Sequence, residues 1–140
     1  MTPERTFAII KPDAVRAGHA GRILARIEEA GFTARALRMT HLSKREAEGF
    51  YAVHQARPFF ASLTDFMSSG PCIVMALEAP DAIKKWRSLM GATDPAKAAP
   101  GTIRAQFAES IEANSVHGSD CPENAGAEID FCFKPAEIVG

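Results

Sequence analysis

Short apolar runs alternate along this chain with segments in which apolar residues recur every three or four positions. The continuous runs at 6–10 and 72–78 predict buried strands, because each is short and adjoins turn-forming residues. Alternating apolar residues predict two further strands, one within 32–42 and one at 129–133. A chain with this pattern can bury its apolar side chains by packing helices against a sheet.

Helical periodicity marks four segments between these runs. The first carries Ile23, Leu24 and Ile27 on one face and would end at Gly31. The second starts with the capping-box pattern Ser-Lys-Arg-Glu, and the third follows a proline. These three helices and a fourth are expected near 22–30, 43–50, 58–67 and 82–90.

The order of these elements predicts a single α+β domain spanning residues 1–140. The expected architecture is a ferredoxin-like sandwich, in which a four-stranded antiparallel sheet is covered by helices that form a layer over one face. A chain of 140 residues is long enough to bury one sizeable apolar core.

Residues 91–116 interrupt the alternation and are expected to form a long loop. The part at 91–102 contains two prolines and two glycines and has no apolar period. Loops of this length in small domains are usually either functional or disordered, and this composition is compatible with both. A short helix expected to begin at Thr102 favours an ordered, functional loop.

Composition excludes several general functions. The net charge is −1, so the chain has no overall attraction to nucleic acid or to anionic membranes. The apolar runs are too short to cross a bilayer and the N-terminus lacks a signal-peptide pattern, so a soluble cytoplasmic protein is expected. Cys72, Cys121 and Cys132 are odd in number and lack metal-ligand spacing, which predicts reduced thiols.

One histidine, His117, lies in the polar loop 114–120 between an asparagine, serines, a glycine and an aspartate. Imidazole has an ordinary pKa of about 6.5, so a good fraction is uncharged near neutral pH and can attack phosphorus. Taken alone, a histidine in such a turn is more often a surface or capping residue. The interpretation as a nucleophile therefore depends on other parts of the chain.

Four separated segments favour the nucleophile. Ile10–Asp13, Tyr51–Phe60, Gly91–Arg104 and Asn114–Asp120, in this order and approximate spacing, closely resemble the nucleoside diphosphate kinases. Each segment is a weak sign by itself, but the four together are specific, and the resemblance runs nearly from end to end. It implies that residues 1–140 form one nucleoside diphosphate kinase domain, which transfers the terminal phosphate of a nucleoside triphosphate to a nucleoside diphosphate.

The resemblance also implies a ping-pong mechanism, in which His117 carries the phosphoryl group between two nucleotides. Lys11 and Tyr51 would lie near the transferred group, where positive charge and positioning matter most. Ser119 and Glu128 would orient and polarise the histidine, with Glu128 expected just before the last strand. These five residues are the expected catalytic set.

A second set of residues is implied to bind the nucleotide. The base would stack on Phe59, and an aromatic face accepts purines and pyrimidines alike, so broad base tolerance is expected. The resemblance implies broad sugar tolerance as well. Other members would hold the phosphates, for which arginine has forked donors, or the sugar hydroxyls. Outside this motif context the same side chains would be interpreted as core packing or solvated charges. The full set is Lys11, Phe59, Leu63, Arg87, Thr93, Arg104, Ile111 and Asn114.

The loop also contains residues without an assigned chemical step. Asp120 is expected to fix the loop backbone or to cap the helix that Pro122 begins. Cys121 stands where serine is more usual in the family, and Asp94 where asparagine is more common. Neither change removes a proposed catalytic group, and the thiol is interpreted either as an inert small residue or as an oxidation-sensitive one.

The implied cofactor is Mg²⁺ carried mainly by the substrate phosphates, since no carboxylate cluster has metal-site spacing. The expected partners are nucleoside triphosphates and diphosphates and further copies of this chain, in a tetramer or a hexamer. Neither nucleic acid nor membrane is expected as a partner. Two rival functions remain, an RNA-binding sheet, which would need exposed aromatics and a basic surface, and a scaffold that has lost activity.

Overall fold

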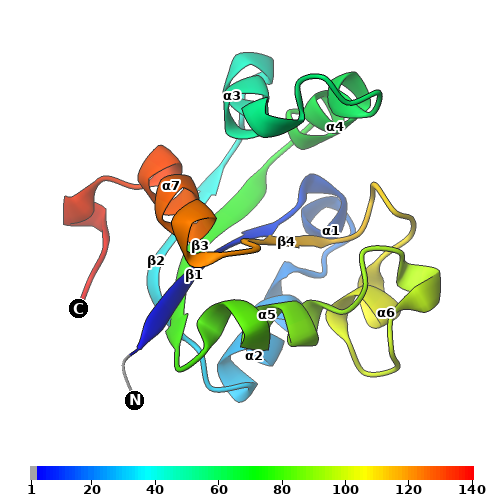
Figure 1. Cartoon of the computed structure of the whole chain (residues 1–140). Helices are drawn as coiled ribbons and strands as arrows, with labels where there is room; N and C mark the ends of the chain where they lie inside the picture. Colours follow the sequence, from blue (N-terminus) through cyan, green and yellow to red (C-terminus); the bar gives the residue numbers. More distant parts are fainter. Residues whose placement is uncertain (1–2) are drawn as a thin grey trace.

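Strand β1, Glu4–Ile10, lies inside a four-stranded sheet of order β2-β3-β1-β4 (Figure 1). Its neighbours are β3, Cys72–Ala79, and β4, Val116–Gly118, while β2, Thr33–Thr40, pairs with the other side of β3. All three pairings are antiparallel, which confirms the predicted α+β class. The computed structural model describes residues 3–140.

Helices cover both faces of the sheet, so the expectation of a helical layer on one face only is wrong. Successive residues of β1 point to opposite faces, which places Phe7 and Ile9 in one apolar cluster and Ala8 and Ile10 in the other. A strand that is buried on both faces needs a continuous apolar run, which is why 6–10 and 72–78 show no alternation.

One face is covered by α2, Ala20–Glu29, and α5, Ala82–Met90, which bury Ile23, Ile27, Trp86 and Met90. The short helix α1, Pro12–Arg16, follows β1 directly where the sequence indicates a turn. The other face is covered by α3, Lys44–Phe50, α4, Phe60–Met67, and α7, Pro122–Cys132.

The predicted helical segments correspond to α2, α3, α4 and α5, and the boundary signals explain why. The capping box at the start of α3 is present, with Glu46 N–H donating to Ser43 Oγ over 3.0 Å and Ser43 N–H donating to Glu46 Oε1 over 2.8 Å. Between α3 and α4 lies a 3-10 turn, η1, Ala52–His54.

The strand expected at 129–133 is wrong, because these residues end helix α7. Ile129 and Phe133 are both buried, but Phe131 between them is 49% exposed. The burial thus repeats every four residues, as in a helix, although the letters alternate as in a strand. The fourth strand is β4, which places His117 opposite Ile9 of β1.

The segment 91–116 has a defined course instead of being one long loop. It contains η2, Pro95–Lys97, and α6, Ile103–Phe107, which begins as expected after Thr102, whose Oγ1 accepts from Ala105 N–H over 3.3 Å. Arg26 of α2 donates to the Gln106 side chain over 2.6 Å. A last 3-10 turn, η3, Pro135–Glu137, follows α7.

Two further expectations concern the chain as a whole. Cys72, Cys121 and Cys132 are free thiols, and Cys72 is buried. Among residues 3–140, no helix has the length and apolar character needed to cross a bilayer.

Candidate functional site

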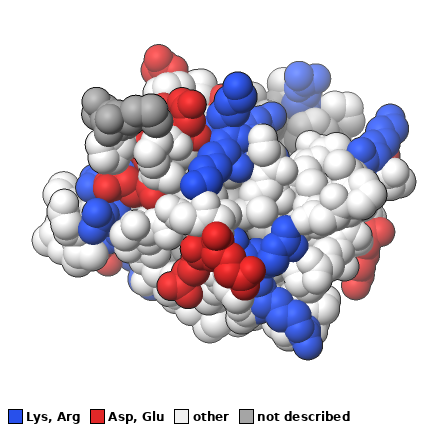
Figure 2. Space-filling model, turned by 90° about the horizontal axis from the view of Figure 1, so that it is seen from below, with Lys and Arg blue, Asp and Glu red and all other residues white. Residues whose placement is uncertain are grey.

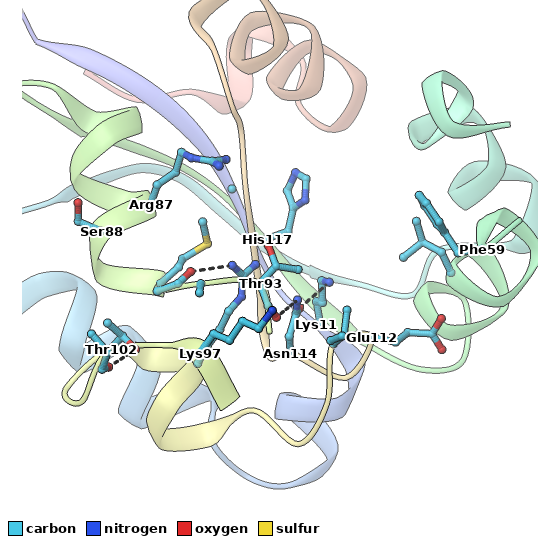
Figure 3. Close-up of a pocket in the computed structure, with 18 of the residues that line it drawn as sticks. Lys11, Phe59, Arg87, Ser88, Thr93, Lys97, Thr102, Glu112, Asn114 and His117 are labelled. Carbon is cyan, nitrogen blue, oxygen red and sulfur yellow. Dashed lines mark hydrogen bonds between the residues drawn. The ribbon is translucent and has the colours of Figure 1, made fainter. Parts of the chain in front are cut away.

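A cavity of about 950 Å³ opens between α4, the C-terminal end of α5, the segment 91–102 and β4 (Figure 3). In Figure 3, Phe59 and Arg87 lie on opposite sides of this cavity, with His117 between them. Ten of the residues expected from the sequence line it, although they come from separate segments: Lys11, Tyr51, Phe59, Leu63, Arg87, Thr93, Arg104, Ile111, Asn114 and His117. The two others do not line the cavity: Glu128 contacts the His117 ring, and Ser119 contacts Glu128.

The His117 ring is held through one of its nitrogens. Its Nε2 lies 2.9 Å from Oε1 of Glu128. A carboxylate oxygen only accepts hydrogen bonds, so Nε2 carries the hydrogen in this contact and Nδ1 keeps its lone pair. The ring therefore presents one defined nitrogen that can act as a nucleophile.

Ser119 acts on the histidine through Glu128. The Ser119 hydroxyl donates to the same Oε1 over 2.9 Å, and it accepts from the backbone N–H of Phe7 over 3.3 Å. Glu128 reaches the ring from α7, so its expected position before a final strand is wrong. The hydrogen bond from Ser119 limits the carboxylate to one orientation toward His117.

Burial lowers the pKa of His117 below its ordinary value, while the hydrogen bond and charge of Glu128 oppose this shift. Aromatic rings contribute to the burial, since Phe50 and Tyr51 lie edge-on to the imidazole at centroid distances of 5.5 and 6.1 Å. A lowered pKa keeps the imidazole neutral near pH 7, which is the form that can attack an electrophile.

The backbone of His117 is positioned by α5. The indole Nε1–H of Trp86 donates to the carbonyl oxygen of His117 over 3.0 Å. A Cβ atom on Gly118 would lie 2.4 Å from Trp86 Cδ1 and 2.6 Å from Met90 Cε, so only glycine allows this close approach. Nothing in the sequence distinguishes Trp86 from an ordinary core residue of a helix.

A strained turn precedes β4. Ser115 has a φ of 72°, and Val116 N–H donates to the Asn114 carbonyl over 2.9 Å, which together form a γ-turn of the rare kind. The turn is held from β1 and α1, because Ser115 N–H donates to Asp13 Oδ2 over 3.1 Å and Lys11 N–H donates to the Ser115 carbonyl over 2.8 Å. These contacts join the Lys-Pro-Asp motif to the histidine loop.

Lys11 is almost fully buried beside this turn. Its Nζ donates to Asn114 Oδ1 over 2.8 Å, and Asn114 Nδ2 in turn donates to the Thr93 carbonyl over 3.3 Å. Burial, and then the nearby charge of Arg104, lower the pKa of Lys11 to about 8. The amine is thus a cation whose charge an incoming anion would stabilise.

Arg104 supports the loop as well as lining the cavity. Its guanidinium donates to the carbonyl oxygens of Gly91 over 3.0 Å and of Val116 over 2.8 Å. Burial, and then the charge of Arg87, lower the pKa of Arg104 to about 10. Two of its nitrogens are thus engaged with backbone, which leaves the exposed Arg87 as the more available of these two cations.

The apolar end of the cavity is open to solvent. Phe59 is 46% exposed and Ile111 is 60% exposed, and Leu63 lies partly buried in the same wall. An exposed aromatic ring that lines a cavity can stack on a flat ligand. Tyr51, by contrast, is buried, and its hydroxyl has no hydrogen-bond partner among the described residues.

Asp120 does not cap helix α7, and its other expected role, fixing the loop backbone, stays a prediction. Its side chain accepts from the Asn124 side chain over 2.6 Å. The N-cap residue of α7 is Cys121, which makes no side-chain cap hydrogen bond. The predicted capping role of Asp120 is therefore wrong.

The cavity is also lined by residues that the sequence did not indicate as part of a site, notably His54, Ser88, Lys97, Thr102 and Glu112. They lie within or next to the family-like segments but have no distinctive spacing of their own. Within residues 3–140, no group of three or more histidine, cysteine or acidic side chains is placed to hold a metal ion.

Comparison with known proteins gives consistent similarities. A family model described as nucleoside diphosphate kinase matches residues 4–138. The nucleoside diphosphate kinase of Desulfotalea psychrophila is 59% identical over 136 residues, which cover 97% of this chain and 99% of that protein. The nucleoside diphosphate kinase of Rhizorhabdus wittichii is 59% identical over 140 residues, which cover 100% of this chain and 100% of that protein.

Solved structures show the same fold. The nucleoside diphosphate kinase of Aquifex aeolicus superposes with a TM-score of 0.96 at 47% identity, covering 99% of this chain and 100% of that one. A halophilic nucleoside diphosphate kinase from Halobacterium salinarum, solved in complex with CDP, gives a TM-score of 0.95 at 38% identity and covers 99% and 93% of the two chains.

Proposed function

The chain belongs to the nucleoside diphosphate kinase family of phosphotransferases, and we propose that it works in two steps through a phosphohistidine at His117. The observation that carries this proposal is the contact between His117 Nε2 and Glu128. It leaves Nδ1 as the free nucleophile of a neutral imidazole in a cavity lined by cations.

In the first step, Nδ1 of His117 forms a bond to the γ-phosphorus of a nucleoside triphosphate. The bond from that phosphorus to the β–γ bridging oxygen breaks, and the nucleoside diphosphate leaves. In the second step, a terminal oxygen of another nucleoside diphosphate attacks the phosphohistidine and restores the imidazole. Glu128 stabilises the ring while it carries the phosphoryl group, because it accepts from Nε2–H throughout.

The basic residues of the cavity supply most of the transition-state stabilisation. A phosphoryl group in transfer carries negative charge on its oxygens, which favours fixed cations and hydrogen-bond donors around it. Lys11 would contact the transferred group, with Tyr51 beside it, and Arg87, Thr93 and Arg104 the remaining phosphates. Their shared position around one cavity supports these roles.

The apolar end of the cavity would hold the base. Phe59 would stack on it, with Leu63 and Ile111 beside it. Because stacking needs only a flat π surface, this arrangement supports broad base tolerance. Asn114, together with Lys11, would reach the sugar hydroxyls. The CDP complex of the Halobacterium salinarum relative is consistent with a nucleotide site in this family.

Mg²⁺ would enter with the nucleotide, bound mainly by phosphate oxygens and water. The cavity residues could not bind Mg²⁺ by themselves, because Glu112 is the one carboxylate among them. The other polar groups of the cavity wall are basic, amide and hydroxyl side chains. They fit a magnesium-bound phosphate chain well, because Lys11, Arg87 and Arg104 line the cavity and would donate to its oxygens. Magnesium supplies charge neutralisation when bound.

A homo-oligomer, a tetramer or a hexamer, is also proposed. Leu37 and Met39 are 50% and 57% exposed on β2, which is an edge strand of the sheet. Exposed apolar residues on an edge strand favour association with another chain. The cytoplasmic location stays a prediction.

The RNA-binding alternative has weak support. Both faces of the sheet are covered by helices and buried in apolar clusters, so the sheet offers no open stacking platform. On the face of the molecule shown in Figure 2, acidic side chains lie among the basic ones. Nucleic acid would therefore meet a mixed surface there.

The phosphohistidine is tested by incubating the protein with γ-labelled ATP and then adding unlabelled GDP. The wild-type protein is expected to take up an acid-labile, alkali-stable label that GDP removes as labelled GTP. The variant His117→Ala should take up none. If the wild type stays unlabelled, or if His117→Ala labels equally, the two-step mechanism is wrong and the scaffold alternative gains support.

A further inference from the structure

A carboxylate lies at the apolar end of the cavity. Glu112 follows Ile111 in the chain and lines the same cavity as Phe59 and Leu63. Figure 3 shows its carboxylate on the Phe59 side of the cavity, away from Arg87. The mechanism proposed for phosphoryl transfer gives this side chain no role.

Glu112 is anchored from across the cavity. The hydroxyl of Ser62, in helix α4, donates to Glu112 Oε2 over 2.7 Å. Ser62 precedes Leu63, so this hydrogen bond joins the two walls that would enclose the base. The other oxygen, Oε1, accepts no hydrogen bond from any residue in the range 3–140.

The turn that carries Glu112 is itself closed by hydrogen bonds. Glu109 N–H donates to the Ala113 carbonyl over 2.9 Å, and Ala113 N–H donates to Ser110 Oγ over 3.0 Å. A side chain that is held at its backbone and at one oxygen has few conformations to lose on binding a ligand. Glu112 is thus prepared to accept hydrogen bonds in a fixed direction.

We propose that Glu112, held by Ser62, is a specificity-determining residue that accepts hydrogen bonds from the edge of the nucleotide base. This inference rests on the proposed function, in which the base stacks on Phe59. Stacking tolerates every base, whereas a carboxylate distinguishes bases by their donors. The site would accept all nucleotides but rank them.

The expected ranking follows from the donors on each base. Guanine presents a ring N–H beside an amino group, which matches the two oxygens of a carboxylate. Adenine and cytosine each present one amino group. Uracil and thymine have one ring N–H between two carbonyl oxygens. These two oxygens are repelled by a carboxylate. Guanine should therefore gain most from Glu112 and uracil least.

The experiment measures how fast each of GDP, ADP, CDP and UDP removes the label from the phosphorylated protein. The readout is the ratio of the second-order rate constants for GDP and UDP. Glu112→Ala is expected to lower this ratio about three- to tenfold, the range of one hydrogen bond at a solvent-facing site. Ser62→Ala should lower it less, because the carboxylate remains but loses its anchor.

Glu109→Ala is the matched control, because it removes the same charge from the same turn at an exposed position outside the cavity. It should leave the GDP to UDP ratio unchanged. Glu112→Gln should lower the ratio, since its amide NH₂ can donate to a uracil carbonyl. Dissociation constants for GDP and UDP, measured by calorimetry, give the same ratio without any phosphoryl transfer.

Two outcomes would overturn the role of Glu112. One is a GDP to UDP ratio within twofold of wild type in Glu112→Ala, and the other is an equal loss for all four nucleotides. Failure of the proposed function is distinguishable, because a wild-type protein that takes up no label can still be compared with Glu112→Ala by calorimetry. A labelled protein with an unchanged ratio removes only the specificity role.

Discussion

His117 and Glu128 are joined by one hydrogen bond, from Nε2 to Oε1 over 2.9 Å, and that same oxygen also accepts from Ser119 over 2.9 Å. One carboxylate oxygen thus sets the tautomer and, through Ser119, the direction of the ring. Removal of Glu128 affects both the orientation of His117 and its charge stabilisation, whereas removal of Ser119 affects orientation alone.

The first prediction separates these two contributions. Glu128→Ala should lower the rate of His117 phosphorylation by ATP about 10²-fold, because the ring loses the one side-chain hydrogen bond that it makes within residues 3–140. Glu128→Gln keeps an accepting oxygen but loses the charge, so a loss of about tenfold is expected. Ser119→Ala should cost less than either. Rapid-mixing measurements of labelling decide the order, and a wild-type rate in Glu128→Gln would contradict the electrostatic role.

The second prediction concerns pH. His117 has a pKa below its ordinary value of 6.5, so the loss of its lone pair by protonation should reduce kcat/KM only below pH 6.5. Lys11 has a pKa of about 8, so its positive charge is lost as the pH rises through that value and kcat/KM should fall on the alkaline side. In the nucleotide complex the phosphates stabilise the charged amine and so raise the pKa of Lys11. The alkaline fall of kcat should therefore begin at a higher pH than the fall of kcat/KM.

The variant Lys11→Arg identifies the source of the alkaline fall. Arginine loses its proton at a much higher pH than lysine does, so the fall of kcat/KM near pH 8 should move to higher pH even though the altered geometry lowers the rate overall. An alkaline limb that is unchanged in Lys11→Arg would show that a different group titrates. The measurement is a series of kcat/KM values between pH 5 and pH 10, an interval that includes the ordinary pKa of histidine and the lowered pKa of Lys11.

The elements that were predictable from the sequence are those with strong local signals. Strands β1 and β3 are continuous apolar runs, and α3 has a complete capping box. Strand β4 has no such signal, because it is three residues long and polar at its centre. Helix α7 was misinterpreted because Ile129 and Phe133, spaced as helical neighbours, are separated by the half-exposed Phe131.

The site shows the same division. The residues that the family resemblance implied were predictable, and ten of them share one cavity. Trp86 and Glu112 were not, because their importance comes from tertiary neighbours: Trp86 donates to the His117 backbone, and Glu112 meets Ser62, 50 positions earlier in the chain. Such contacts leave no periodic trace in one sequence.

A third prediction tests the stacking role of Phe59. Phe59→Ala should weaken the binding of all four nucleotides together, by about 1–3 kcal/mol, because every base has a π face. Phe131→Ala is a suitable control, since Phe131 is similarly exposed at 49% but does not line the cavity. Calorimetric titration of both variants gives the comparison, and a loss confined to purines would contradict stacking as the main base contact.

The last prediction concerns the close packing of Gly118 under helix α5. A Cβ at this position would lie 2.4 Å from Trp86 Cδ1, and the buried indole has little room to move. Gly118→Ala should therefore lower the free energy of unfolding by about 1–3 kcal/mol through overpacking. It should also slow His117 phosphorylation, because the displaced strand carries the histidine.

Gly126 provides the opposite case within the same chain. A Cβ there meets no atom within 4 Å, and the residue lies on the exposed face of α7. Gly126→Ala should therefore raise the free energy of unfolding by about 0.5–1 kcal/mol through helix propensity. Urea unfolding of both variants measures the two effects. If Gly118→Ala is as stable as the wild type, the indole can move aside, and Trp86 does not fix the position of His117.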